Sequence, residues 1–107
     1  MFTVIHYNSP NGRPIYLNWL ENLADQQAAA KIAARVQRLK SGSFGDCKPL
    51  SGGVWELRID YGPGYRVYYG MIGQTVVLLL SGGDKRKQTA DIERAVDYLN
   101  DYKRRMK

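Results

Sequence analysis

The residues best suited to chemistry in this chain are cations placed on and after short apolar strands. Residues 54–86 read as three consecutive strands, and the polar side of the first two carries Arg58 and Arg66. The third strand runs into a Gly-Gly-Asp-Lys-Arg segment that supplies Lys85 and Arg86. Guanidinium groups bind two phosphate oxygens at once and stay charged near neutral pH. These four cations therefore predict an anion-binding sheet face.

Such a face is suited to cleavage of RNA, because clustered cations stabilise the charge that develops when a phosphodiester is attacked. RNA supplies its own nucleophile, the 2′-hydroxyl, so the protein must provide positioning, charge stabilisation and proton transfer but no metal. Glu56 and Asp84 are the candidate general bases because both lie near the cations. Tyr68 shares the face with the arginines and is the candidate for stacking on a base. We expect all four cations and Glu56 to be catalytic.

Two further lysines are expected to bind RNA, although an ordinary solvated sheet face is also compatible with the sequence. Lys48 and Lys87 are the predicted contacts to the RNA backbone. A pairing of Asp60 with Arg66 is equally compatible with an ordinary ion pair on a solvated sheet face. His6 has no partner at ligand spacing, and the glycine-rich segment lacks phosphate-loop spacing. We therefore expect neither a metal site nor a cofactor.

Composition limits the class of protein. The 107 residues, of which 44% are hydrophobic, predict one domain covering residues 1–107. Sixteen Lys and Arg against ten Asp and Glu give a net charge of +6, which favours a polyanionic partner. The single cysteine, Cys47, excludes an internal disulfide and favours a reducing cytoplasm. The longest apolar run, residues 76–80, is too short to cross a membrane, so we expect a soluble cytoplasmic protein.

Hydrophobic spacing and turn residues predict the elements in order. Residues 2–7 form a strand, a helix starts at Pro14, and Asp25 caps a second helix that Gly42 ends. Residues 41–53 read as a loop, three strands follow, and Thr89 is a possible cap for a last amphipathic helix. The predicted fold is α+β: strand, helix, helix, three-strand antiparallel meander and helix, with the helices on one face of a small twisted sheet.

Turn length sets the predicted strand register. A three-residue loop, Gly62-Pro63-Gly64, would place Ile59 opposite Val67 and make Arg58 a diagonal neighbour of Arg66. A two-residue turn at Gly73-Gln74 would place Arg66 opposite Ser81. The cations would then share the sheet face that the helices leave free.

Several segments resemble the RelE/HigB-type toxins of bacterial toxin–antitoxin modules. They are Trp55-Glu56-Leu57-Arg58, Gly64-Tyr65-Arg66-Val67-Tyr68-Tyr69 and Leu80-Ser81-Gly82-Gly83-Asp84-Lys85, followed by Gln88 and Asp91-Ile92. The chain is most similar to the branch called phage-derived Gp49-like or addiction module killer proteins. The resemblance covers nearly the whole chain.

The resemblance implies a toxin that enters the ribosomal A site and cuts mRNA by transfer of the phosphate to the 2′-hydroxyl. It also implies a cognate antitoxin, expected to be of the helix-turn-helix type. Arg66 matches the family's arginine on the middle meander strand, and Arg86 matches the cation after the last strand. Glu56, however, stands where RelE carries a catalytic lysine, and Ile92 where RelE has a functional tyrosine. The proton-transfer groups are therefore not implied.

Two alternatives follow from these departures. A ParE-like inhibitor of DNA gyrase shares the fold but acts by binding a protein, and that branch generally lacks the four cations found here. An inactive relic would still bind an antitoxin without cutting RNA. The cation set favours the ribonuclease.

Overall fold

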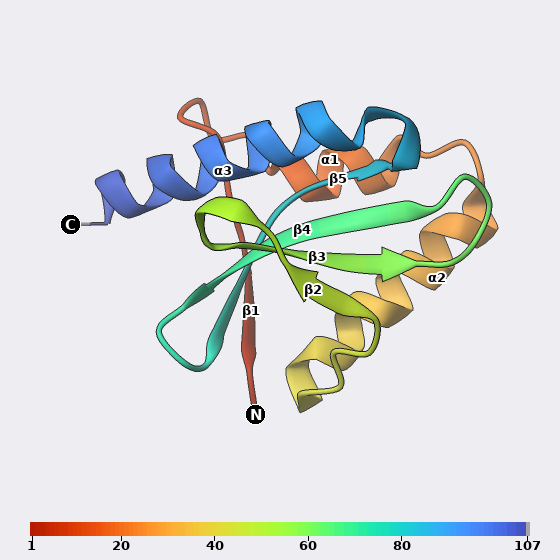
Figure 1. Cartoon of the computed structure of the whole chain (residues 1–107), viewed down its shortest axis with the longest axis horizontal. Coiled ribbons are helices and arrows are strands. Elements are labelled where there is room, and N and C mark those ends of the chain that lie inside the picture. Colours follow the sequence, from red (N-terminus) through yellow and green to blue (C-terminus); the bar gives the residue numbers. More distant parts are fainter. Residues whose placement is uncertain (107) are drawn as a thin grey trace.

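The chain folds around one sheet with three helices (Figure 1), and the computed structural model describes residues 1–106. The elements are β1 (Thr3–His6), α1 (Ile15–Glu21), α2 (Gln26–Arg38), β2 (Cys47–Pro49), β3 (Val54–Ile59), β4 (Tyr65–Ile72), β5 (Val76–Asp84) and α3 (Gln88–Arg105). Short 3₁₀ turns cover Leu39–Ser41, Ser51–Gly53 and Lys85–Lys87.

The sheet is mixed, with the strand order β1-β5-β4-β3-β2. The meander β3-β4-β5 is antiparallel, and β1 adds to β5 in parallel. This arrangement confirms the predicted α+β class. Strand β2 lies within the segment that was predicted as a loop, and it pairs with β3 at the sheet edge. Its three residues include Pro49, which lacks a backbone donor and is tolerated only at an edge, so no strand pattern was visible.

Local signals account for the start and the end of α2. The Asp25 side chain accepts a hydrogen bond from the backbone N–H of Ala28 at 3.1 Å, which confirms the predicted cap of α2. Gly42 adopts a left-handed φ of 84° at the end of the turn that follows α2. Thr89 does not cap α3: the side chain that caps this region is Asp84, which accepts from the N–H of Arg86.

Helices cover both faces of the sheet, which corrects the expectation that all of them share one face. Helices α1 and α2 enclose a core on one face, built around buried residues such as Ile32, Leu57 and Val67. Helix α3 packs on the other face, where Leu99 joins Val54, Tyr68 and further residues in a second core. Strand β5 contributes to both cores because it is central and alternates Val77 and Leu79 with Leu78 and Leu80.

The register between β3 and β4 differs from the prediction by two residues. Ile59 pairs with Tyr65 and Arg58 pairs with Arg66, so residues 60–64 form a five-residue loop. Gly62 and Gly64 take left-handed φ values of 57° and 84° in this loop. A shift of two keeps every side chain on its predicted face, because strand side chains alternate with a period of two. The two arginines therefore lie directly opposite each other.

The register between β4 and β5 also differs, because the turn spans residues 73–75 and an irregularity falls between Tyr68 and Tyr69. Arg66 consequently pairs with Gly83 instead of Ser81. A β-bulge of this kind inserts one unpaired residue and cannot be read from alternation alone. It brings the end of β5, and with it Lys85, beside the loop of residues 60–64, where the Lys85 N–H donates to the Gly64 carbonyl at 3.0 Å.

Candidate functional site

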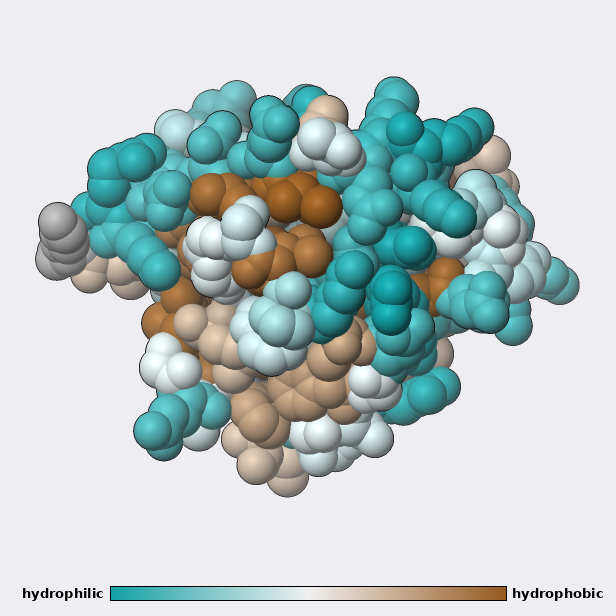
Figure 2. All heavy atoms as spheres, viewed as in Figure 1, coloured by the Kyte–Doolittle hydropathy of each residue, from teal (hydrophilic) through white to brown (hydrophobic). Residues whose placement is uncertain are grey.

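An open groove of about 360 Å³ lies at the end of β3 and β4 that α3 leaves uncovered. Its lining includes three cations and two carboxylates, together with the glycine-rich loop: Asp46, Arg58, Asp60, Gly62, Pro63, Gly64, Arg66 and Lys85. Hydrophilic residues cover this part of the molecule in Figure 2, whereas hydrophobic residues gather between α3 and the sheet. We call this hollow the cation groove.

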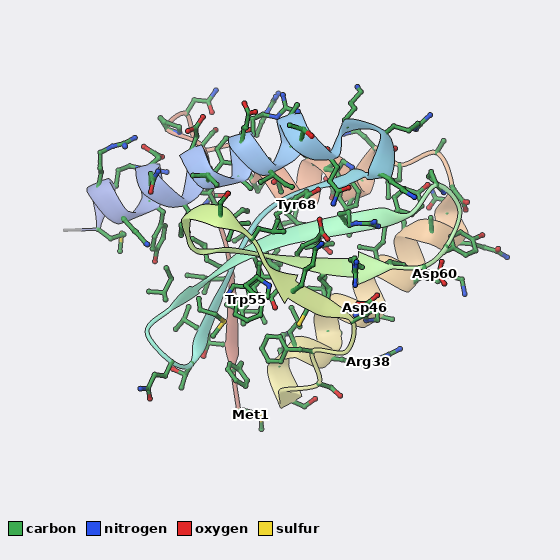
Figure 3. All side chains as sticks on the ribbon, viewed as in Figure 1. Met1, Arg38, Asp46, Trp55, Asp60 and Tyr68 are labelled. Carbon is green, nitrogen blue, oxygen red and sulfur yellow. The ribbon has the colours of Figure 1, made fainter. Side chains whose placement is uncertain are left out.

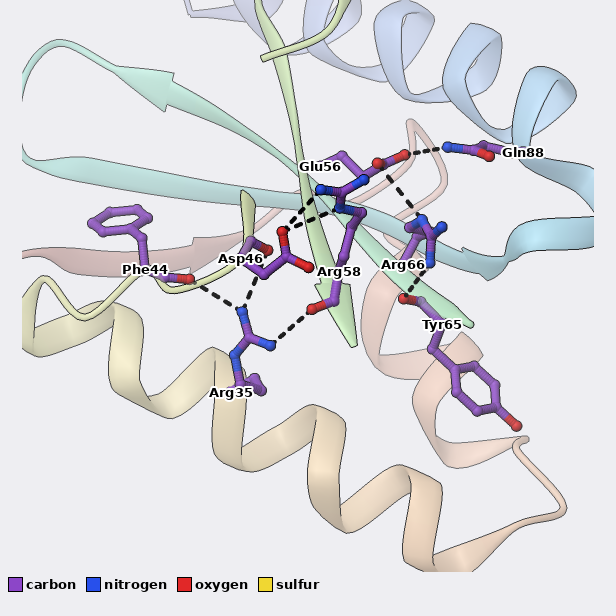
Figure 4. Close-up of polar contacts among 8 residues, drawn as sticks. All are labelled: Arg35, Phe44, Asp46, Glu56, Arg58, Tyr65, Arg66 and Gln88. Atoms are coloured by element: carbon purple, nitrogen blue, oxygen red, sulfur yellow. Dashed lines mark hydrogen bonds and ion pairs between the residues drawn. The ribbon is translucent and has the colours of Figure 1, made fainter. Parts of the chain in front are cut away.

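Arg58 is held at the rim of the cation groove by Asp46. Its Nε and Nη2 atoms donate to the same carboxylate oxygen, Oδ1, at 3.2 and 3.0 Å. The two side chains are 37% and 54% exposed, so this ion pair is open to solvent and contributes under about 1 kcal/mol. Helix α2 fixes the backbone beneath it, because Arg35 donates to the carbonyls of Arg58 at 2.7 Å and Phe44 at 3.2 Å (Figure 4).

Arg66 sits deeper, and a buried carboxylate sets its position. Glu56 is fully buried, and its Oε1 lies 3.6 Å from Nε of Arg66, whose side chain is 12% exposed. Gln88, the first residue of α3, donates to the other oxygen of Glu56 at 2.6 Å. The guanidinium also donates to the Tyr65 carbonyl at 3.3 Å (Figure 4). Arg66 thus lines the groove, and the buried carboxylate of Glu56 beneath it compensates its charge.

The position of Glu56 does not favour the predicted role as general base. Its carboxylate has no exposed surface and does not line the cation groove, so it has no direct access to a substrate hydroxyl. Glu56 instead positions Arg66. The other candidate base, Asp84, faces a different hollow and binds the Arg86 guanidinium at 2.8 Å. That hydrogen bond holds the pKa of Asp84 below its ordinary value and makes it a weaker base.

Three of the four predicted catalytic cations share one site. Arg58, Arg66 and Lys85 line the cation groove, while Arg86 and Lys87 lie on the other side of the Lys85–Lys87 turn and line a neighbouring hollow. The cause is the geometry of that turn, since consecutive residues leave a 3₁₀ turn in different directions.

The other two predicted RNA contacts, Tyr68 and Lys48, also lie outside the cation groove. Tyr68 is fully buried against α3 and is therefore not accessible for stacking on a base. Burial raises the pKa of its hydroxyl far above the ordinary value, so it stays protonated. Lys48 is exposed on β2, opposite Glu56, and does not line the cation groove. Figure 3 shows Tyr68 near α3, and Asp46 and Asp60 toward the open end of the sheet.

Sequence reasoning missed Asp46 and Gln88 as contributors to this site. Asp46 comes before an unpredicted strand, and Gln88 reaches Glu56 across 32 positions of the chain. Asp60 was considered only as a partner of Arg66. It lines the groove and makes no ion pair with any of the residues described. Because Asp60 comes two residues after Arg58, its closeness to a predicted cation could have marked it as a site residue. No local pattern marks Asp46 or Gln88 in this way.

Among residues 1–106, no group of three or more His, Cys, Asp or Glu side chains is placed to hold a metal ion. Within the same range, no helix has both the length and the apolar character needed to span a bilayer.

Comparison with known proteins gives the family. Residues 18–99 match the family described as phage derived protein Gp49-like (DUF891). An uncharacterized protein of Haemophilus influenzae is 50% identical over 78 residues, which is 73% of this chain and 79% of that protein. The chain belongs to the Gp49-like family, a family of the addiction-module killer, RelE-like toxin type. Membership of this toxin type implies an antitoxin partner.

Proposed function

We propose that this protein is the toxin of a toxin–antitoxin module and acts as an endoribonuclease that cleaves mRNA on the ribosome without a metal. The observation that carries the proposal is the grouping of Arg58, Arg66 and Lys85 around one open groove. A pentacoordinate phosphate gains negative charge on its non-bridging oxygens, and fixed cations lower the energy of that state. The family's toxin type supports the same conclusion.

The two arginines take the non-bridging oxygens of the scissile phosphate in this proposal. They pair directly across β3 and β4, so both side chains leave the same sheet face at adjacent positions. The buried carboxylate of Glu56 and the carbonyl of Tyr65 hold Arg66 in one orientation. A guanidinium that is already oriented loses little side-chain entropy when it binds phosphate. Arg66 is therefore the main phosphate-binding residue.

The remaining groups handle protons and the leaving oxygen. The 2′-oxygen attacks phosphorus, the bond from phosphorus to the 5′-oxygen breaks, and the products are a 2′,3′-cyclic phosphate and a 5′-hydroxyl. We assign Asp60 as the acceptor of the 2′-hydroxyl proton, because it lines the groove and has no ion-pair partner among residues 1–106. Lys85 follows the end of β5, across β4 from Asp60, and neutralises or protonates the leaving 5′-oxygen.

The test compares an arginine inside the groove with an arginine outside it, in cells and in a reconstituted translation reaction. Wild-type protein should arrest growth and yield new mRNA 5′ ends by primer extension. Arg66→Ala should lower the cleavage rate by about 10²–10³, the usual loss on removal of one transition-state donor. Arg38→Ala on α2 removes a cation of equal charge outside the groove and should leave cleavage unchanged.

The alternative functions predict different results in the same experiment. Growth arrest with intact mRNA and reduced supercoiling by purified gyrase would favour a ParE-like inhibitor. Absence of growth arrest in cells without antitoxin would favour an inactive relic. Equal cleavage by wild type and Arg66→Ala would remove the proposed active site.

A further inference from the structure

A second hollow of about 320 Å³ lies beside the cation groove, on the other side of the Lys85–Lys87 turn. It occupies the space between α1 and α3 along the outer edge of β5, on which α1 and α3 both pack (Figure 1). Its lining combines two half-buried aromatic side chains, Trp19 and Tyr98, with three cations and two carboxylates: Arg86, Lys87, Arg94, Asp84 and Asp91. Arg86 pairs with Asp84 and Arg94 with Asp91, so Lys87 adds the net positive charge. We call it the edge pocket.

On its side away from β4, the β5 backbone in the edge pocket has no strand partner among the residues described. Strand β1 pairs with β5 as far as Leu79, and among the residues described no other strand continues on that side. Beyond Leu79, the β5 residues Ser81, Gly82 and Gly83 form part of the pocket lining. The Ser81 hydroxyl is buried and has no hydrogen-bond partner among residues 1–106. A buried hydroxyl without a partner costs free energy, which a ligand with a polar edge would recover once the Ser81 side chain turns toward it.

Aromatic and glycine residues shape the pocket for a flat ligand. The Trp19 ring packs directly over Gly82, so closely that a Cβ there would overlap the ring. Tyr98 stacks on Tyr7 at a centroid distance of 5.0 Å and is held in place. Single-stranded RNA is bound by stacking of bases on aromatic side chains and by hydrogen bonds to base edges. The pocket offers these two kinds of contact together with flanking cations.

We infer that the edge pocket binds one nucleobase of single-stranded RNA next to the nucleotide whose phosphate enters the cation groove. The inference rests on the proposed function for its choice of ligand. Lys85 lines the cation groove and Arg86 lines the edge pocket, and these residues are adjacent in sequence. A single RNA strand that crosses this turn therefore places a phosphate on one side and a neighbouring base on the other. The pocket determines where along the RNA the cut falls.

The test uses the fluorescence of Trp19. The chain has two tryptophans, and Trp55→Phe removes the other one, which lies in an apolar hollow with Phe2 and Phe44. The probes are 2′-O-methyl hexanucleotides of A, C, G or U, which cannot be cleaved because the 2′-oxygen is blocked. An abasic hexanucleotide of equal charge controls for phosphate binding. We expect at least one base-bearing probe to quench Trp19 and the abasic probe to bind at least about tenfold more weakly.

A matched pair of variants on α3 locates the effect. Arg94 lines the pocket and pairs with Asp91 three residues before it, whereas Arg104 pairs with Asp101 in the same way outside the pocket. Arg94→Ala should weaken the probe severalfold, and Arg104→Ala should leave it unchanged. Equal quenching by the abasic probe, no quenching by any probe, or a response to the antitoxin alone would overturn the inference. Since the probes are not cleaved, failure here leaves the cleavage test of Arg66 unaffected, and failure of that test leaves this binding result standing.

Discussion

Replacement of Glu56 by glutamine tests whether a buried carboxylate organises the cation groove. The carboxylate is fully buried and lies 3.6 Å from the Arg66 guanidinium. Their Coulomb attraction is about 4 kcal/mol at an effective dielectric constant of about 20. Loss of one partner from a buried pair typically costs about 3–5 kcal/mol, because the other charge stays buried without compensation. Glutamine can still accept from Gln88, so we expect the free energy of unfolding to fall by about 2–3 kcal/mol.

Denaturant unfolding of wild type, Glu56→Gln and Asp46→Asn measures this loss. Asp46→Asn is the control because its ion pair with Arg58 is exposed and should be worth under about 1 kcal/mol. For a chain of this length, the expected loss for Glu56→Gln lowers the melting temperature by about 10–20 °C. Adding Arg66→Met removes the uncompensated charge and should restore part of the stability, with a coupling of about 1–3 kcal/mol.

Two results would refute this reasoning. The first is a stability of Glu56→Gln equal to that of Asp46→Asn, and the second is a double variant that shows no coupling with Arg66. Either result would mean that Glu56 does not hold Arg66. A separate measurement addresses catalysis: at a temperature where Glu56→Gln is folded, its cleavage should keep the wild-type pH profile with a reduced rate, whereas loss of a general base changes the acidic limb of that profile.

Three further predictions follow from other parts of the structure. Asp60→Asn should lower the cleavage rate by about 10²–10⁴ without loss of stability, and an unchanged rate in single-turnover assays would contradict its assignment as proton acceptor. Gly83→Ala should destabilise the fold by about 1–3 kcal/mol, because its new methyl group would overlap the buried carboxylate of Asp91; an unaltered urea midpoint would argue against this packing. Burial raises the pKa of Tyr16 to about 12, so between pH 10 and 12 the unfolded chain loses this proton first and stability should fall as pH rises; urea titrations at pH 9 and 11 should show a smaller fall for Tyr16→Phe.

The order of elements could be predicted from the chain because each depends on local spacing and turn residues. Asp25 at the start of α2 and Gly42 after it are signals that act within one turn, and both are confirmed. The sheet face of each residue on β3 and β4 was also predictable, whereas Leu78 and Leu80 of β5 lie on the face opposite to the one expected from the predicted register. Side chains along a strand point alternately to the two faces, so a register error of two residues between β3 and β4 leaves every side chain on its face. Glu56, Arg58 and Arg66 therefore lie together on one face, as predicted.

Contacts between distant segments were not predictable in the same way. The burial of Glu56 and Tyr68 depends on where α3 packs, and α3 lies on the face that local spacing left empty. Strand β2 forms because β3 offers an edge to pair with, not because its three residues favour a strand.

Residue type and the alternation of side chains along a strand are local properties, so the chain alone predicts that arginines and a lysine gather near the end of a meander. Which of these cations share a groove depends on how the helices and strands pack together. Helix α3 covers one end of the face and leaves the other open, and the bulge in β5 brings Lys85 to the open end beside Arg58 and Arg66. The physical reason is that burial and charge pairing depend on surfaces brought together from distant parts of the chain, which no local pattern encodes.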